Sequence, residues 1–457
     1  MSATKNRTSI GDRGGAHREN RGEGWGSSDC TWATFFRMHH PLLLLSRIAI
    51  ALSSLAVTLP AHASELDRCL AAQGLPRVAR ALGPDGAPTY ALVTAEEGGE
   101  PRALSPLAPI DTPLAEVFDL AASRAGVAGE VWEFTKDEAR SRLCPPAGVA
   151  QADLDGDRAL IVAAGLNYAA HAEEAGGGDV FVFPKPASPT SPYLGVAPPA
   201  GVTLLDWEIE LGLVLLEDVR LDALPDDEGL LSRAAFFVAN DVSDREPIIR
   251  EKSLMGPGTG FVTAKGQPGF LPLGPWMVRG TELGAALFAC GAEGMGLRLD
   301  VDEGAGPTRR QEATTEQMIL EPPELIARIA SQVAETGQTT PMPRILNGEP
   351  RHDPLVLPAE GGGHHWPAGT IVLTGTPEGV ALQAPDVLPV LLRGLLRLRG
   401  PLQQFRVEEV ERAARGEPGG YLEAGDVVRA TIDGLGTQRF PVLPAGSPQP
   451  ADPCGGT

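Results

Sequence analysis

Positive charge is scarce in this chain of 457 residues, in which 38 Lys and Arg stand against 59 Asp and Glu and leave a formal charge of −21. That balance argues against a nucleic-acid phosphate backbone or an anionic membrane as the partner. The five cysteines form no C-x-x-C pair and no Cys/His spacing of the kind that binds zinc. No internal repeat at a solenoid period is present. The 55 glycines and 42 prolines, spread between short apolar runs, indicate a turn-rich protein built mainly of strands.

An uninterrupted apolar run of about 20 residues, enough to span a bilayer, is also missing, because Arg47 interrupts the most apolar stretch. The first 37 residues are polar and rich in Arg, Gly and Ser, which predicts disorder. After Met38, the expected translation start, come Arg47, the apolar run Ile48–Pro60 and the A-x-A pattern of Ala61–Ala63. This order predicts an extension and signal peptide over residues 1–63, cleaved near Ala63, and export to the periplasm. A membrane-anchored protein is the less favoured alternative.

Four cysteines follow the predicted cleavage site, namely Cys69, Cys144, Cys290 and Cys454. An even number of cysteines in an exported protein permits disulfides. Cys69 and Cys144 flank one N-terminal region, so we favour that pair. The other pairings stay open at the level of sequence.

The rest of the chain divides into a small N-terminal domain over residues 64–156, a strand-rich domain over 157–445 and a flexible tail over 446–457. We expect an α+β fold that is mainly β, because the larger domain holds runs of Val, Ile, Leu and Phe, many bounded by Gly or Pro. The expected strands are 159–164, 202–216, 234–239, 276–278, 370–373 and 427–432. Proline in the first turn predicts a helix over Glu321–Ala330. A packed pair of amphipathic surface helices is expected over Val387–Arg415.

Two glutamates stand two residues apart in an otherwise apolar run, Leu205–Leu211. Because side chains alternate along a strand, Glu208 and Glu210 should point to one face and Trp207 to the other. Two neighbouring carboxylates repel each other when buried, and a divalent cation removes that cost. Mg²⁺ prefers oxygen ligands of this kind. Taken alone, the pattern also fits a solvated strand face.

A short helix is predicted over Tyr168–Ala175, between an apolar strand and three glycines. His171 and Glu174 are three residues apart and would share one face of this helix. A carboxylate beside an imidazole fixes its tautomer and raises its basicity, which suits a general base. An exposed His–Glu pair on a surface helix is the plainer alternative.

Three further segments carry polar residues at strand ends or turns. Asp241 follows the expected strand 234–239, although aspartate is also a common turn residue. Lys265 stands ten residues before Pro275, and a single lysine is usually solvated. Gly375 and Thr376 lie in a turn that ends the expected strand 370–373, and such turns often present donors to an anion. Each signal is weak by itself.

The order of these segments resembles the fumarylacetoacetate hydrolase family, over roughly residues 157–442. The matching blocks are G-x-N-Y-x-x-H-x-x-E at Gly165–Glu174, the F-x-K-P block at Phe183–Pro186 with Lys185 shifted by one position, D-x-E-x-E-L at Asp206–Leu211, N-D-x-x-x-R at Asn240–Arg245, a lysine before P-L-G-P at Lys265 and Pro272–Pro275, G-T-P-x-G-V at Gly375–Val380 and L-x-x-G-D at Leu422–Asp426. Seven blocks in order make the resemblance specific.

The resemblance implies the mixed β-roll fold of that family, a homodimer, and 2-oxo acids or 1,3-dicarbonyl compounds as substrates. It assigns Glu208, Glu210 and Asp241 as ligands of Mg²⁺ or Mn²⁺. His171 and Glu174 match the pair that activates water, on a segment that closes over the site. The remaining assignments are Lys265 as a catalytic and substrate-binding group, Thr376 and Gly375 as substrate-binding groups, and Arg245 in a structural role or in support of the metal ligands.

The chemistry of these residues is consistent with that assignment. A 2-oxo acid could occupy open coordination positions of the metal, which would polarise the keto group and stabilise an enolate. Water activated by the His–Glu pair would then attack a distal carbonyl and cleave a carbon–carbon bond. Without attack of water on that distal carbonyl, the same site could support hydration, isomerisation or decarboxylation. A periplasmic binding protein that kept the fold without turnover is the alternative from another class.

Overall fold

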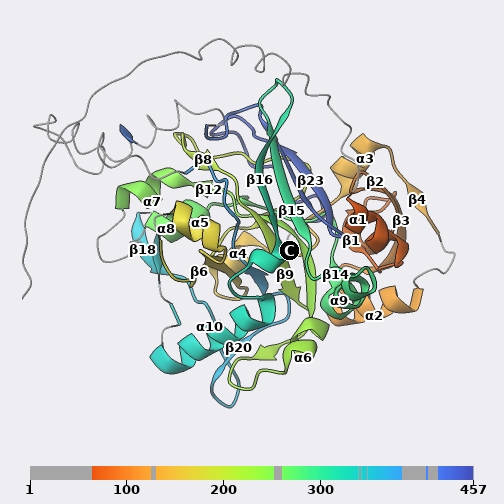
Figure 1. The fold of residues 1–457 in the computed structure, drawn as a ribbon, viewed down its shortest axis with the longest axis horizontal. Helices are drawn as coiled ribbons and strands as arrows, with labels where there is room; N and C mark the ends of the chain where they lie inside the picture. The colour runs from red at the N-terminus through yellow and green to blue at the C-terminus, as the bar shows by residue number, and fades with distance from the viewer. Residues whose placement is uncertain are drawn as a thin grey trace, which may run out of the picture. The chain divides into compact units, whose positions relative to one another are not determined.

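A six-stranded sheet lies at the centre of the structure, with its strands in the order β14-β11-β9-β21-β5-β6 (Figure 1). Strands β9 and β11 lie inside this sheet, pair antiparallel and are buried along their whole length. Runs rich in Val, Leu, Phe and Ala form such strands because both faces are covered. These strands are β5 (Ile161–Gly165), β6 (Phe181–Pro184), β9 (Ile209–Leu215), β11 (Ala234–Asn240), β14 (Val278–Arg279) and β21 (Ile371–Leu373).

The structure is a computed structural model that describes residues 64–124, 130–175, 177–251, 260–337, 339–340, 342–346, 348–382, 408–409 and 420–455. The predicted signal peptide lies outside these residues, as does nearly all of the helical segment predicted over Val387–Arg415. Within the described residues, no helix has both the length and the apolar character needed to cross a membrane.

The N-terminal part of the described chain forms its own four-stranded antiparallel sheet, in the order β1-β2-β3-β4. Its apolar core continues without a break into that of the central sheet, and Val78 pairs with Met277 through backbone hydrogen bonds. The boundary expected near residue 156 stays a prediction. The elements of this part are α1 (Glu65–Ala72), β1 (Val78–Leu82), β2 (Pro88–Glu97), β3 (Glu100–Pro109), α2 (Leu114–Arg124), β4 (Trp132–Glu133), α3 (Lys136–Arg142) and α4 (Gln151–Asp155).

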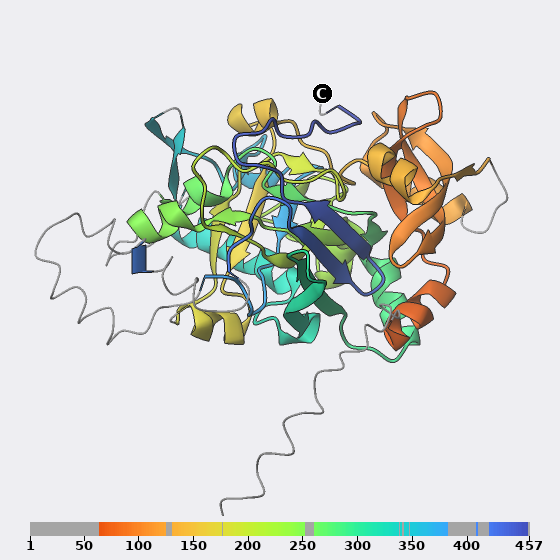
Figure 2. The same cartoon turned by 90° about the horizontal axis from the view of Figure 1, so that it is seen from above.

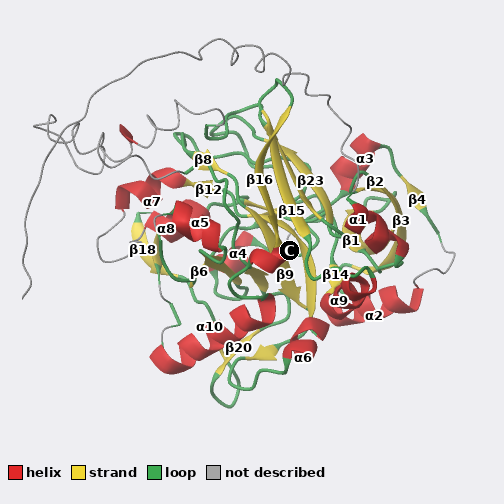
Figure 3. Cartoon of the chain, viewed as in Figure 1, coloured by secondary structure: helices red, strands yellow, loops and turns green. Residues whose placement is uncertain are grey.

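A third sheet, in the order β16-β15-β22-β23, adds a second layer of strands that Figure 2 shows beside the central sheet. Helices lie mainly around the margins of the strand layers (Figure 3). The strands of the third sheet are β15 (Gly296–Asp302), β16 (Pro307–Thr314), β22 (Val427–Ile432) and β23 (Gly436–Pro441). The other helices are α5 (Ala169–Glu174), α6 (Asp227–Ser232), α7 (Arg245–Glu251), α8 (Gly260–Lys265), α9 (Gly280–Ala289), η1 (Thr315–Gln317) and α10 (Pro322–Thr336). The short strands are β7 (Pro189–Thr190), β8 (Leu205–Asp206), β10 (Val219–Arg220), β12 (Ser243–Asp244), β13 (Leu271–Pro272), β17 (Pro343–Leu346), β18 (Glu349–His352), β19 (Leu357–Pro358) and β20 (His364–Trp366).

The predicted α+β class, mainly β, is confirmed, and most expected strands are found within one or two residues of their predicted bounds. The run expected over 202–216 is divided into β8 and β9. The helix predicted over Glu321–Ala330 is found as α10 and extends to Thr336. It ends there because Gly337 adopts a left-handed conformation with φ of 64° and caps the last turn.

The favoured disulfide between Cys69 and Cys144 is wrong. Cys69 is bonded to Cys290, and Cys144 to Cys454, in each case with Cα atoms 5.9 Å apart. Helix α1 carries Cys69 to the C-terminal end of α9, where Cys290 is the capping residue. Spatial distance between Cα atoms, and not separation along the chain, decides which cysteines can pair.

The tail expected to be loose is held at several points. Cys454 is tied to Cys144, and Asp452 forms an ion pair with Arg80 at 3.7 Å. The side chain of Gln449 accepts a hydrogen bond from the backbone N–H of Ala197 at 2.9 Å. Composition does not report such long-range contacts, and the flexibility predicted for residues 446–457 stays a prediction.

Candidate functional site

Pairing between β9 and β11 brings three carboxylates together. Glu210 lies opposite Ala239 in the antiparallel register, and the backbone N–H of Asp241 donates to the carbonyl of Glu208 at 2.8 Å. Two residues before Glu210, Glu208 therefore lies opposite Asp241, which is two residues after Ala239. Both side chains lie on the same face as that of Glu210. Carboxylate oxygens of the three residues lie within 4.8 Å of one another, and all three side chains are buried.

The other segments predicted to form the site lie at the same edge of the central sheet. Strands β5 and β21 are parallel to each other, and β9 runs antiparallel to both β21 and β11. The C-terminal ends of β5, β21 and β11 therefore meet at the edge where β9 begins. The chain leaves β5 toward His171, leaves β21 toward Gly375 and leaves β11 at Asp241. Topology thus explains why blocks far apart in sequence share one site.

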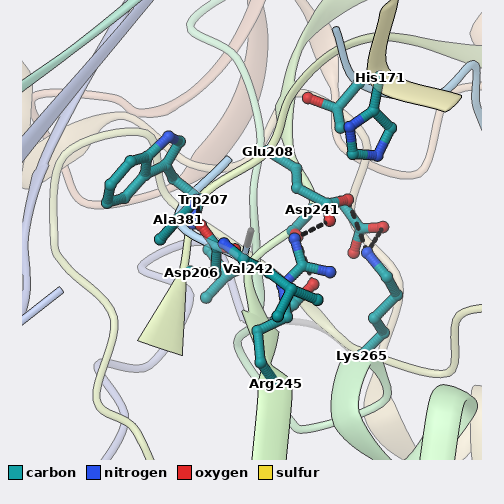
Figure 4. Close-up of polar contacts among 12 residues, drawn as sticks. His171, Asp206, Trp207, Glu208, Asp241, Val242, Arg245, Lys265 and Ala381 are labelled. Atoms are coloured by element: carbon teal, nitrogen blue, oxygen red, sulfur yellow. Dashed lines mark hydrogen bonds and ion pairs between the residues drawn. The ribbon is translucent and has the colours of Figure 1, made fainter. Parts of the chain in front are cut away.

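Two cationic side chains compensate the negative charge of the Glu208 carboxylate. The ammonium group of Lys265 lies 2.6 Å from a Glu208 oxygen, and the Arg245 guanidinium donates to the other oxygen of the same carboxylate (Figure 4). Burial by itself would raise the pKa of Glu208, but Lys265 and Arg245 outweigh it and hold the pKa at about 2. Arg245 also donates to Asp206 at 2.8 Å, which fixes the position of its side chain.

Two lysines flank Asp241. Lys265 lies 2.7 Å from one oxygen of this carboxylate, and the fully buried Lys185 lies 2.5 Å from the other. Burial lowers the pKa of Lys185, although Asp241 offsets part of that effect. For Lys265, Asp241 and Glu208 together outweigh burial and raise the pKa, so this ammonium group stays charged.

Glu210 is the carboxylate without such compensation. Its carboxylate accepts the backbone N–H of Gly375 at 2.8 Å, and it makes no ion pair with the residues that the structure describes. Burial raises its pKa well above the usual range, and the neighbouring carboxylates of Asp241 and Glu208 add to the effect. A divalent cation among the three carboxylates would supply the missing positive charge.

The predicted helix α5 places His171 and Glu174 on one face. Nδ1 of His171 lies 3.1 Å from a Glu174 oxygen, and the same carboxylate accepts the backbone N–H of Gly379 at 3.2 Å. Both side chains are mostly buried, which sets aside the alternative of a solvated surface pair. Figure 4 shows the imidazole ring on the side of the Glu208 carboxylate.

The turn after β21 is fixed to β9 and to the loop after β5. Gly375 has a φ of 96°, and a Cβ there would lie 3.0 Å from the Cβ of Asn167, so glycine is required. The Asn167 amide donates to the carbonyl of Thr374 at 2.8 Å. The Thr376 hydroxyl donates to the Ile209 carbonyl and accepts from Gln311, both at 2.9 Å. In this structure the hydroxyl predicted to bind substrate forms its hydrogen bonds with other residues of the protein.

The structure thus brings together all of the predicted site residues and adds two that sequence reasoning missed. No role is predicted for Lys185 from the sequence, although its position in the block Phe183–Pro186, which matches the family motif, indicates a functional residue. Asp206 also received none. Its carboxylate accepts the backbone N–H groups of Ala381 and Leu382 at 2.9 and 3.0 Å, and so ties the start of the E-x-E segment to the loop beyond β21.

Comparisons with known proteins agree with this geometry. Residues 160–443 match the family model described as fumarylacetoacetate hydrolase, C-terminal. A 2,4-didehydro-3-deoxy-L-rhamnonate hydrolase of Sphingomonas sp. is 28% identical over 290 residues, which cover 61% of this chain and 71% of the relative. A Burkholderia lata protein named as a hydrolase is 33% identical over 284 residues, which cover 60% of this chain and 70% of the relative.

Among solved structures, that of Cg1458 with an inhibitor aligns with a TM-score of 0.50 and 18% identity, over 81% of this chain and 100% of Cg1458. At this identity the comparison supports the fold and says nothing about the substrate.

Proposed function

Because the chain belongs to the fumarylacetoacetate hydrolase family, we propose that it is a divalent-metal-dependent hydrolase that cleaves a carbon–carbon bond in an acylpyruvate-type 2-oxo acid. The observation that supports this most is the buried cluster of Glu208, Glu210 and Asp241 with His171 and Glu174 beside it. A hard cation site next to an oriented imidazole suits water-dependent cleavage beside a carbonyl group.

The three carboxylates fit a hard divalent ion such as Mg²⁺ or Mn²⁺. They offer only oxygen ligands, and Glu210 is buried beside two other carboxylates with no ion pair among the described residues. When bound, the ion would polarise the keto oxygen of the substrate and stabilise negative charge that develops there.

The protein groups supply the rest of the chemistry. His171, oriented by Glu174, would take a proton from water, whose oxygen attacks the carbonyl carbon distal to the 2-oxo acid group. The bond between this carbon and its neighbour then breaks, and the electron pair stays with the fragment that carries the 2-oxo acid group, which takes up a proton. Lys265 is charged and stands beside Glu208 and Asp241, so it can stabilise negative charge on that fragment.

A 2-oxo-acid hydratase, isomerase or decarboxylase is the second candidate. The same carboxylates and Lys265 would serve it, because these reactions also build negative charge next to a 2-oxo acid group. The position of the His171–Glu174 pair beside the cluster favours a reaction that consumes water over isomerisation and decarboxylation, and hydrolysis and hydration are separated by their products.

Turnover should appear only with a divalent metal and only on substrates that carry a 2-oxo acid group. The panel comprises acylpyruvates, simple 2-oxo acids, 1,3-diketones and 2,4-didehydro-3-deoxy-L-rhamnonate, each with Mg²⁺, with Mn²⁺ and with EDTA. Mass spectrometry of the products separates cleavage from hydration, isomerisation and decarboxylation. Loss of CO₂ without cleavage would support the second candidate. No turnover of any compound in the presence of metal would point to a binding protein.

We further propose that the protein works in an oxidising compartment outside the cytoplasm. The two disulfides support this, because structural disulfides are rare in the cytosol. The pattern of basic, apolar and A-x-A segments before Ser64 is the second support.

Protein purified from its native host, alkylated without prior reduction, should show Cys69, Cys144, Cys290 and Cys454 unlabelled. Its N-terminal peptide should begin at Ser64. As the matched control, the same sample is reduced and alkylated again, and all four cysteines should then be labelled. Free thiols at these positions together with an intact Met1 or Met38 in the cytosolic fraction would contradict export.

A further inference from the structure

A cavity lies away from the carboxylate cluster, between α1, the turn of the β2–β3 hairpin and the third sheet, and has a volume of about 140 Å³. Two hydrogen bonds close its walls. The backbone N–H of Thr437 donates to the carbonyl of Gly99 at 2.9 Å, and that of Gly434 donates to Asp67 at 2.7 Å. Figures 1 and 2 both place the N-terminal sheet β1-β2-β3-β4 next to β15 and β23. None of the residues that line it belongs to the proposed catalytic site.

Positive charge gathers in this cavity, although the chain as a whole is acidic. Of the described residues, five arginines and three carboxylates line it. Arg68, Arg77 and Arg429 make no hydrogen bond or ion pair through their guanidinium groups with any residue that the structure describes. The other two arginines are paired with acidic side chains, Arg298 with Asp433 and Arg309 with Asp300.

The carboxylates of the cavity are already engaged elsewhere. Asp67 accepts the N–H of Gly434 and forms an ion pair with Arg298 at 3.5 Å. Glu96 accepts the backbone N–H of Gly99 at 2.7 Å, within the hairpin turn. Asp300 accepts from Nε of Arg309 at 2.6 Å. These acids do not form an ion pair within 4.0 Å with any of the three unpaired arginines among the described residues.

Arg77 is the most informative of the three. Its guanidinium carbon lies 5.1 Å from the centre of the Trp276 ring, and its Nε is buried with no hydrogen-bond partner among the described residues. The ring itself is fixed, because its Nε1 donates to the carbonyl of Gly434 at 3.1 Å. Burial lowers the pKa of Arg77, and the charges of Glu96 and Asp67 offset only part of this. Stacking on an aromatic face leaves the N–H groups of a guanidinium free in its plane to bind an anion.

We propose that this cavity binds a small oxyanion, a phosphate or a dicarboxylate of about four carbons. Planar guanidinium groups bind carboxylate and phosphate oxygens in a bidentate manner, and three such groups are available here. The volume sets the size, since a protein cavity of about 150 Å³ holds a molecule such as benzene. An anion in the cavity would bridge α1, Trp276 and β22, elements that are distant in sequence. The proposal does not depend on the catalytic function.

The test is calorimetric titration of the full chain, with disulfides intact and EDTA present so that no metal recruits anions to the carboxylate cluster. Inorganic phosphate and succinate are the two probes, titrated separately. We expect one anion per chain for at least one of them, and the responding probe identifies the ligand class. The substitution Arg77→Met should weaken binding by at least about tenfold, because it removes charged hydrogen bonds.

Arg68→Met is the second variant, since Arg68 is exposed on α1 and its removal should leave the fold intact. It should weaken binding of the same probe. Arg328→Met is the matched control, because Arg328 is exposed on α10 and does not line the cavity. Failure of both probes to bind at millimolar concentration would overturn the proposal. Equal affinities for the wild type and both cavity variants would do so too, as would an equal loss in Arg328→Met.

Discussion

Replacing His171 with alanine should lower kcat by about 10²- to 10⁴-fold, the usual cost of removing a general base. Metal affinity should stay close to that of the wild type, because His171 contacts Glu174 and not the carboxylate cluster by any hydrogen bond. Glu174→Gln should cost less, since Gln can still accept from the backbone N–H of Gly379 and hold the loop after β21. The measurement is kcat/KM for the wild type and each variant on whichever substrate turns over.

The double variant of His171 and Glu174 should be no worse than His171→Ala alone, because Glu174 acts through the imidazole and residues that act as a unit are not additive. His364→Ala is a suitable control, as this histidine lies on β20 outside the site and should leave kcat unchanged. Multiplicative losses in the double variant would mean that the two residues act independently. A fully active His171→Ala would place the base elsewhere.

Neutralising the two glutamates of the cluster should have opposite effects on stability and the same effect on metal binding. Glu208 is paired with Lys265 and Arg245, so Glu208→Gln leaves two buried cations with one partner fewer. The metal-free protein should lose on the order of 3 kcal/mol of unfolding free energy. Glu210 makes no ion pair with described residues, and Glu210→Gln removes carboxylate repulsion. That variant should gain on the order of 1 kcal/mol.

Both variants should bind Mg²⁺ or Mn²⁺ more than about 100-fold more weakly, since changes to residues behind the ligands already cost about 10- to 100-fold. Denaturant unfolding in EDTA and calorimetric titration with metal are the two measurements. Asp353→Asn is the control, because it breaks a buried pair with Arg344 at 2.8 Å and Asp353 makes no hydrogen bond or ion pair with Glu208, Glu210 or Asp241. It should lower stability and leave metal affinity unchanged. A Glu210→Gln protein that is less stable, or that binds metal normally, would contradict the assignment.

Local periodicity accounts for the parts of the site that the sequence predicts well. Alternation along a strand places Glu208 and Glu210 on one face, and helical spacing places His171 three residues from Glu174. Both relations involve neighbours in the chain, so they hold whatever the rest of the fold does. The order of the motif blocks adds Asp241, Lys265 and the turn at Gly375, because it reflects a family whose fold brings them together.

How the charges of the site compensate one another could not be predicted from the sequence, and only the tertiary structure shows it. No local sequence pattern indicates that Lys185 forms an ion pair with Asp241, or that the Thr376 hydroxyl forms hydrogen bonds with Ile209 and Gln311. These contacts join segments that are tens to hundreds of residues apart, and their geometry follows from strand register and core packing. Register in turn depends on many weak side-chain contacts summed across the sheet, which no single segment determines.

The sequence by itself determined the fold class, the two glutamates on one face, the His–Glu spacing and the acidic net charge. Only the tertiary structure decided that Glu208 lies opposite Asp241, that Cys69 pairs with Cys290 and Cys144 with Cys454, and that Arg77 stacks on Trp276 in a cavity that Arg68 and Arg429 also line. The physical reason is the range of the interactions. Backbone propensity and side-chain alternation act over a few residues, whereas pairing of cysteines, charges and strand edges depends on where distant segments pack.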